Sequence, residues 1–144
     1  MMRFVVGSLL TMAVLLVAGC GPSGPPMVVV KGKLLKGGKP LPIQRPDIGL
    51  GWVQMKLIPE GSGKEQVVEM ARAAQDGSFE FVGEGKGITV GTYKLSVLHY
   101  EQGPPNDGLQ GAFADDKTPI RLTITADKGN PLDLGTIELD SPPK

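Results

Sequence analysis

The chain carries one cysteine and one histidine, so few of its residues can do covalent or metal chemistry. Cys20 is the more informative of the two, because it ends an apolar leader that closes with Leu16-Val17-Ala18-Gly19. The leader has one charge near its start, Arg3, followed by an apolar or small run over residues 4–18. This pattern is typical of an export signal, and the run is shorter than the roughly 20 residues that span a bilayer.

Residues 16–20, followed by the Gly/Pro/Ser-rich residues 21–26, resemble the signal and lipobox of bacterial lipoproteins. In that family the thiol receives diacylglycerol, the leader is cut before the cysteine, and the new amino terminus is acylated. The resemblance implies a signal peptide over residues 1–19, a lipidated Cys20 that begins a tether over residues 20–26, and an exported protein held on a membrane of the cell envelope. Val17 stands where leucine is commoner. The alternative is an incidental cysteine in an ordinary secretory signal, which would leave a free thiol in an oxidising compartment.

His99 lies at the end of the clearest predicted strand, and it would act as a general base only with a nucleophile and a carboxylate nearby. Ser96 and an aspartate would complete such a set, but no nucleophile motif surrounds any serine. A zinc site would need further histidine or cysteine ligands. We therefore expect no catalytic residue, no resident metal and no cofactor, and we interpret His99 as a residue that is exposed at a strand end or caps a loop.

Residues 101–118 form the longest stretch without strand periodicity, and long irregular loops in compact domains are often functional. Phe113 in this polar loop either packs back onto the core or anchors a partner. Asp107, Asp115 and Asp116 offer oxygen ligands of the kind that calcium takes, although their order does not match an EF-hand loop. We expect this loop to form the main partner contact through Phe113 and the three aspartates, with residues 43–50 as the second choice.

A second binding hypothesis rests on Trp52 and Tyr100. Together they would form an aromatic platform for a sugar ring if a concave surface surrounded them. Burial of Trp52 in the core is the competing interpretation.

Composition and charge narrow the classes of protein further. The chain has 15 basic and 15 acidic residues, so no charge excess predicts binding to nucleic acid. Glycine (21 residues) and proline (13 residues) are abundant, which favours many turns. They are interspersed with apolar residues, which argues against a disordered chain. A length of 144 residues suits one domain with a modest core.

Apolar residues alternate with a period of two, which predicts β-strands. The predicted strands cover Met27–Leu35, Trp52–Ile58, Ser78–Val82, Thr92–Tyr100, Ile120–Ala126 and Leu132–Leu139. Gly135 is predicted to form a bulge in the last strand, and Asp76-Gly77 a tight turn. Residues 66–73 fit either a strand or a short helix. The expected core comprises Val53, Leu57, Phe79, Phe81, Tyr93, Leu95, Val97, Leu122, Ile124 and Ile137.

Five motifs follow one another in order along the chain: Val30-Lys31-Gly32-Lys33, Gly38-Lys39-Pro40-Leu41-Pro42, Leu57-Ile58-Pro59-Glu60-Gly61, Asp76-Gly77-Ser78-Phe79-Glu80-Phe81 and Gly91-Thr92-Tyr93-Lys94-Leu95-Ser96-Val97. The ordered set resembles the carboxypeptidase regulatory-like (transthyretin-like) domain, particularly the lipoprotein versions of planctomycete-type bacteria. Val90 stands where that family usually has proline, and residues 43–50 look like an insertion. The resemblance covers about residues 27–140 and implies one all-β, antiparallel Greek-key sandwich of about seven strands, with residues 141–144 as a tail.

These observations together predict a non-catalytic, lipid-anchored module of the cell envelope with a structural or adhesive role. Its partners would be the membrane, through Cys20, and an envelope protein or a glycan. A small-ligand or carbohydrate-binding envelope module is the alternative. An enzyme that uses His99 has the fewest residues to support it, since related hydroxyisourate hydrolases use several histidines and a C-terminal Tyr-Arg-Gly-Ser signature, which this chain lacks.

Overall fold

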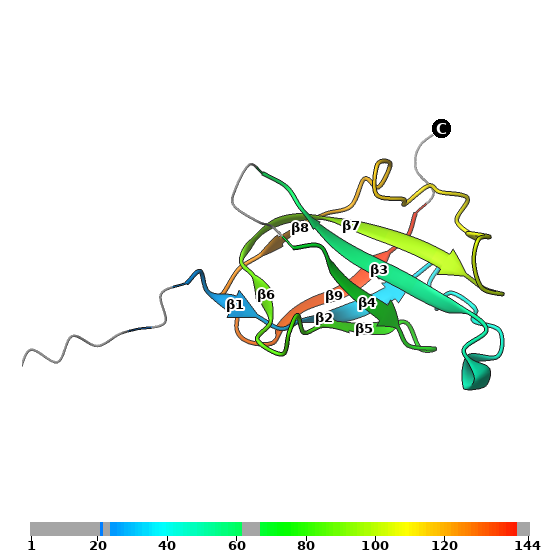
Figure 1. Ribbon diagram of the computed structural model, residues 1–144, viewed down its shortest axis with the longest axis horizontal. Helices are drawn as coiled ribbons and strands as arrows, with labels where there is room; N and C mark the ends of the chain where they lie inside the picture. The colour runs from blue at the N-terminus through cyan, green and yellow to red at the C-terminus, as the bar shows by residue number, and fades with distance from the viewer. Residues whose placement is uncertain (1–20, 22–23, 62–66, 141–144) are drawn as a thin grey trace, which may run out of the picture.

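A computed structural model describes residue 21, residues 24–61 and residues 67–140 of the protein (Figure 1). The leader over residues 1–19, Cys20 and the tail over residues 141–144 lie outside the described residues. The described chain is all-β apart from one short 3-10 turn, η1, over Pro46–Ile48. Its strands are β1 (Met27–Val28), β2 (Val30–Leu35), β3 (Trp52–Pro59), β4 (Glu69–Ala73), β5 (Ser78–Phe81), β6 (Ile88–Thr89), β7 (Gly91–Tyr100), β8 (Arg121–Ile124) and β9 (Leu132–Glu138).

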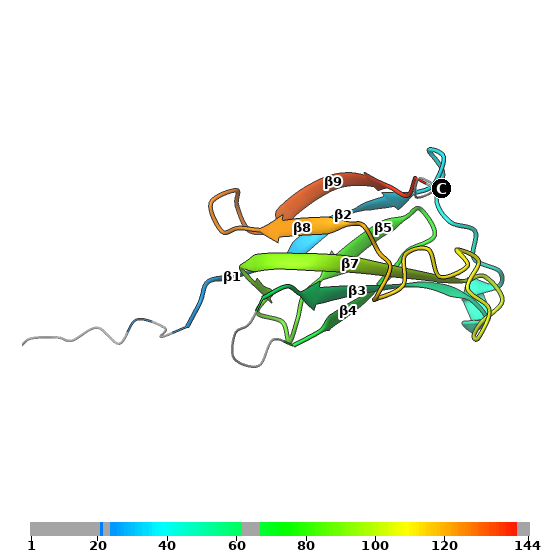
Figure 2. The same ribbon diagram turned by 90° about the horizontal axis from the view of Figure 1, so that it is seen from above.

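Two main sheets share one core, consistent with the predicted β-sandwich. The larger sheet has the strand order β4-β3-β7-β8 and the smaller one β5-β2-β9, while β1 and β6 form a separate short pair. Seen from above, β2 and β9 lie over the layer that holds β3 and β7 (Figure 2). Neighbours in the larger sheet are antiparallel throughout, and β2 is antiparallel to β5.

The pairing of β2 with β9 is parallel, which corrects the prediction of a purely antiparallel sandwich. Both pairings give the same alternation of side chains, so the periodicity of the sequence could not separate them. The predicted bulge at Gly135 is confirmed, because the register jumps from Lys31 opposite Asp133 to Lys33 opposite Thr136. Gly135 has a φ of 68°, a left-handed conformation that glycine adopts without a steric cost.

Alternate residues of the strands face the core, as the period of two in the sequence predicts. Val53, Met55 and Leu57 of β3 are buried, as are Tyr93, Leu95 and Val97 of β7. Eight of the ten predicted core residues are buried, and the other two, Leu122 and Ile137, are partly buried against the same cluster.

The ambiguous segment over residues 66–73 forms strand β4 from Glu69 onward, and Gln66 lies outside the described residues. The predicted turn at Asp76-Gly77 is confirmed, with Gly77 at a φ of 85°. Asp76 Oδ1 accepts a hydrogen bond from the Ser78 backbone N–H at 2.9 Å, which fixes the entry to β5.

The elongated molecule has two distinct ends (Figure 1). At the entry end the chain joins the fold at β1, beside β6, the start of β4 and the end of β5. At the far end β3 begins, β7 finishes, and the loops over residues 41–51 and 101–118 lie next to each other. Among the residues described, no helix has the length and apolar character needed to cross a bilayer.

Candidate functional site

The loop over residues 101–118 replaces a missing strand along β7. Strand β8 pairs with β7 only as far as Lys94, which would leave the rest of that edge open. Beyond this point the N–H groups of Leu95 and Val97 donate to the carbonyls of Ile120 and Phe113, at 3.1 Å and 2.9 Å. An uncovered edge would expose unpaired backbone groups, so the loop has a clear structural task.

Asp107 holds the turn in this loop. Its carboxylate accepts hydrogen bonds from the backbone N–H groups of His99, Leu109 and Gly111, at 2.8 Å, 3.0 Å and 2.8 Å. Three such donors fill most of the accepting capacity of one carboxylate. The side chain is therefore engaged within the loop rather than presented to a partner or a calcium ion.

Phe113 packs back onto the core, with only 3% of its surface exposed. The prediction that it contacts a partner is therefore corrected in favour of its alternative, closure of the loop. Burying an aromatic ring stabilises the fold far more than the surrounding polar loop residues can, so Phe113 pins the loop to the sandwich.

His99 is buried as well, and its position separates it from Ser96. The two residues are three apart on one strand, so their side chains point to opposite faces of the sheet. The His99 Nε2 atom lies 2.6 Å from the carbonyl oxygen of Pro42, which ties the loop over residues 41–51 to β7. A Cβ atom at Gly108 would lie 2.7 Å from His99 Nδ1, so glycine is needed there for close packing. The imidazole joins two loops, and it faces away from Ser96, so it cannot activate that hydroxyl.

On the opposite face of β7, Ser96 is covered by Asp115. The Ser96 hydroxyl donates to Asp115 Oδ1 at 2.6 Å, and Lys56 Nζ forms an ion pair with Asp115 Oδ2 at 3.0 Å. The hydrogen bond from Ser96, with a further contribution from Lys56, lowers the pKa of the Asp115 carboxyl below its ordinary value. Asp116 beside it is exposed. No group of three or more histidine, cysteine or acidic side chains gathers at a metal-binding distance in the described part of the chain.

An aromatic and cationic cluster lies on the outer face of the larger sheet at the far end, and we define it as the Trp52 cluster: Trp52, Tyr100 and Arg72. Trp52 and Tyr100 are direct cross-strand partners, with ring centroids 5.5 Å apart in an edge-to-face arrangement. The Arg72 guanidinium carbon lies 4.6 Å from the centroid of the Trp52 ring, a cation–π distance. Arg72 is exposed, and both aromatic residues are partly exposed.

The Trp52 cluster modifies both sequence interpretations of Trp52. The residue is neither wholly buried nor a bare platform, because Tyr100 and Arg72 both contact its ring. The buried indole N–H finds no hydrogen-bond partner among the described residues. A shallow depression of about 270 Å³, lined by Gln54, Met70, Ala71 and Arg72, continues the surface along β4. The cluster suits contact with a broad surface better than stacking on a sugar ring.

Arg72 was missed by the sequence analysis, although the sequence holds a signal for it. If residues 69–73 are taken as a strand, alternation places Met70 and Arg72 on one face. The register with β3, Gln54 opposite Arg72, is a long-range feature that alternation cannot supply.

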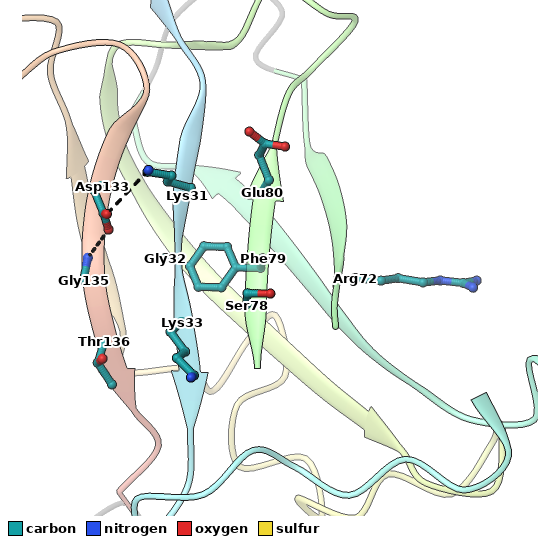
Figure 3. Close-up of a pocket in the computed structure, with 10 residues that line it drawn as sticks. All are labelled: Lys31, Gly32, Lys33, Arg72, Ser78, Phe79, Glu80, Asp133, Gly135 and Thr136. Atoms are coloured by element: carbon teal, nitrogen blue, oxygen red, sulfur yellow. Dashed lines mark hydrogen bonds and ion pairs between the residues drawn. The ribbon is translucent and has the colours of Figure 1, made fainter. Parts of the chain in front are cut away.

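A second hollow, of about 680 Å³, lies over the smaller sheet (Figure 3). Its lining has mixed charge, with Lys31 forming an ion pair with Asp133 at 3.8 Å and Lys33 and Glu80 nearby. The hydroxyls of Ser78 and Thr136 also line it, as does Arg72 of β4, whose side chain extends away from the other labelled residues (Figure 3).

Gly32 lets the Phe79 ring and the neighbouring strand approach closely beneath this hollow. A Cβ atom there would lie 2.8 Å from Phe79 Cζ and 2.9 Å from the Gly135 carbonyl oxygen. The Ser78 hydroxyl donates to Asp76 at 2.6 Å. Ser78 is therefore hydrogen-bonded to a carboxylate with a lowered pKa, which makes that carboxylate a weak base. The hollow offers both hydrogen-bond donors and hydrogen-bond acceptors, but no activated nucleophile among its lining residues.

Comparison of the chain with protein-family models, with curated proteins and with solved structures gives no match.

Proposed function

We propose that the protein is a non-catalytic, lipid-anchored module of the bacterial cell envelope, which holds an envelope protein against the far end of a Greek-key β-sandwich. The anchoring half of the proposal rests on the lipobox-like residues 16–20 and the short Gly/Pro-rich tether that follows them. Several buried acyl chains give stable membrane attachment, whereas a single chain gives only a marginal hold.

The observation that carries the binding half is the Trp52 cluster. Tryptophan, tyrosine and arginine are the residues most enriched where protein interfaces concentrate their binding energy. Here all three meet on one sheet face, within 5.5 Å for the two rings and 4.6 Å for the cation. They lie at the end away from the tether, where an anchored domain is accessible to a partner (Figure 1).

The support for a rigid, non-catalytic role comes from how the polar side chains are used. His99 and Asp107 fasten loops, and Ser96 hydrogen-bonds to a carboxylate that is itself paired with Lys56. A general base needs the proton of a substrate or nucleophile within hydrogen-bonding reach, and His99 is directed instead to a backbone carbonyl. Polar side chains that are engaged within the domain keep its surface rigid, which favours recognition of a partner by the shape of that surface.

A glycan is the second candidate partner, and the hollow over the smaller sheet is the observation that favours it. Its lysines, carboxylates and hydroxyls could both donate to and accept from sugar hydroxyls. In this alternative the site lies mainly on the smaller sheet, although Arg72 lines it as well. The two candidates are therefore separated with Tyr100, which belongs only to the Trp52 cluster, and Lys33, which belongs only to the hollow.

The test is cross-linking of the lipidated protein in its own envelope, followed by identification of what it captures. We compare the wild type with Tyr100→Ala, in the Trp52 cluster, and with Lys33→Glu, in the hollow. Loss of a captured protein in Tyr100→Ala alone is the expected result, because the truncation removes one of the two aromatic rings of the Trp52 cluster. Loss of a captured glycan in Lys33→Glu alone would support the second candidate. Equal capture by all three proteins would contradict both.

A further inference from the structure

Exposed apolar side chains gather at the entry end of the domain. The described residues include seven exposed large hydrophobic side chains, and four of them lie at this end. These four, which we call the apolar rim, are Met27 (39% exposed), Val67 (68%), Val68 (45%) and Val82 (43%). Single exposed apolar residues need no explanation, but a group at one end of a small domain marks a surface that meets something.

A cleft of about 660 Å³ opens within the same end. Met27 and Val67 of the rim line it together with Ile88 and Val90, and its wall includes Pro25, where the tether meets the fold. Thr89 and Tyr93 both belong to the cleft wall, and the Tyr93 hydroxyl donates to the Thr89 carbonyl at 2.7 Å, which holds this part of the wall in place. The cleft therefore joins the end of the tether, at Pro25, to two of the four rim residues, Met27 and Val67.

The length of the tether limits what this surface can meet. Six residues, 21–26, separate Cys20 from the first strand. At roughly 3.3 Å per residue, they span at most about 20 Å. If Cys20 carries lipid, as proposed above, the entry end can never move far from the bilayer. The short tether then keeps the entry end at a high effective concentration beside the bilayer. A contact between them that would be weak for free molecules is therefore strongly populated.

From these observations we infer that the entry end docks on the bilayer that holds the anchor, with the apolar rim at the boundary between headgroups and acyl chains. Charge does not drive this contact, because the acidic Glu69 and Glu84 in the cleft wall outnumber the single lysine there, Lys86, while Glu60 is neutralised by Arg121 at 2.8 Å. Docking in this way directs the Trp52 cluster away from the membrane, toward the compartment that the domain faces (Figure 1).

The experiment exploits the fact that Cys20 is the only cysteine. The chain from residue 20 to residue 144 contains every strand pairing described above, and its Cys20 thiol can be coupled to a maleimide lipid in neutral phosphatidylcholine vesicles. Amide hydrogen exchange is then compared between coupled protein and uncoupled protein mixed with plain vesicles. We expect exchange over residues 82–90 to slow about threefold or more on coupling, with residues 101–118 unchanged, because docking restricts solvent access and local opening only at the entry end.

Matched double variants show whether the apolar rim is responsible. Val67→Glu with Val82→Glu should abolish the slowing at the entry end. Ile48→Glu with Leu50→Glu adds the same two charges to exposed apolar residues at the far end, and should retain it. Unchanged exchange in the coupled wild type would overturn the inference, as would slowing that appears only in anionic vesicles or that survives the rim variant. Chemical coupling replaces acylation in the cell, so failure here leaves lipidation of Cys20 intact, and lipidation is measured separately.

Discussion

The two ends of this domain are built in opposite ways. At the far end, loops without regular structure are fastened by the buried side chains of Phe113, Leu109 and His99 and by the Asp107 carboxylate. At the entry end, a strand pair of two residues each, β1 and β6, stands beside exposed valines and a cleft. A loop becomes rigid when its backbone donors and its few apolar residues are satisfied within the domain. The exposed apolar side chains of the entry end are the ones that we propose to meet the bilayer.

The largest expected difference between the ends is in the response to side-chain truncation. Phe113→Ala should lower the free energy of unfolding by about 3–5 kcal/mol, because it leaves a cavity and releases the loop from the core. Val67→Ala, a truncation at the entry end, should change it by less than about 0.5 kcal/mol, since Val67 is 68% exposed and its truncation leaves no cavity in the core. Urea unfolding of both variants measures this. Equal losses would show that the two ends do not differ in packing.

Removal of the Asp107 carboxylate tests the polar fastening of the far end. Asp107→Ala should lower the free energy of unfolding by about 2–3 kcal/mol, since three backbone N–H groups lose their acceptor. Asp107→Asn should cost less, because one oxygen can still serve His99 and Leu109 while only the bond from Gly111 is lost. Asp116→Ala is the control, with an expected change within about 0.5 kcal/mol. A loss in Asp107→Asn as large as in Asp107→Ala would mean that charge, rather than geometry, holds the turn.

The smallest expected effect is the dependence of the free energy of unfolding on pH. The pKa of Asp115 is lowered by its hydrogen bond with Ser96 and by Lys56, so folding favours the ionised carboxylate. Its contribution to stability is complete above the ordinary pKa of about 4 and is lost as the pH falls through the lower value in the folded state.

Urea unfolding between pH 6 and pH 2 should therefore show a steeper loss of stability below about pH 4 in the wild type than in Asp115→Asn. Ser96→Ala should lie between the two, since it removes the main cause of the lowered pKa. If the wild type and Asp115→Asn lose stability in parallel, the contact between the loop and the sheet does not depend on the carboxylate.

Much of the fold could be predicted from the sequence because its strands alternate strongly. The faces of Trp52–Ile58 and Thr92–Tyr100, the turn at Asp76-Gly77 and the bulge at Gly135 are all local features, and each is confirmed. The parallel pairing of β2 with β9 was missed because strand direction leaves no trace in the alternation of residues.

The candidate site was harder to predict, since it depends on contacts between residues distant in sequence. Asp107 and Phe113 lie in a polar loop, so the sequence made them look available for a partner. A polar loop that covers a strand edge has the same composition as one that is exposed to solvent, so composition could not separate the two cases. The Trp52 cluster combines residues from β3, β4 and β7, whose register is fixed by the sheet rather than by any local motif. The sequence did bring Trp52 and Tyr100 together, as a hypothetical sugar platform, with burial of Trp52 in the core as the competing interpretation.

Anchoring through Cys20 is the central claim, and the mass of the mature amino-terminal peptide tests it directly. Protein isolated from its own envelope should begin at Cys20 and carry a diacylglycerol group on the thiol and a further acyl chain on the amino group. Cys20→Ala should then release the protein from the membrane fraction. A mature protein with an unmodified Cys20, or with an amino terminus at any other residue, would contradict the anchored module and the orientation inferred from it.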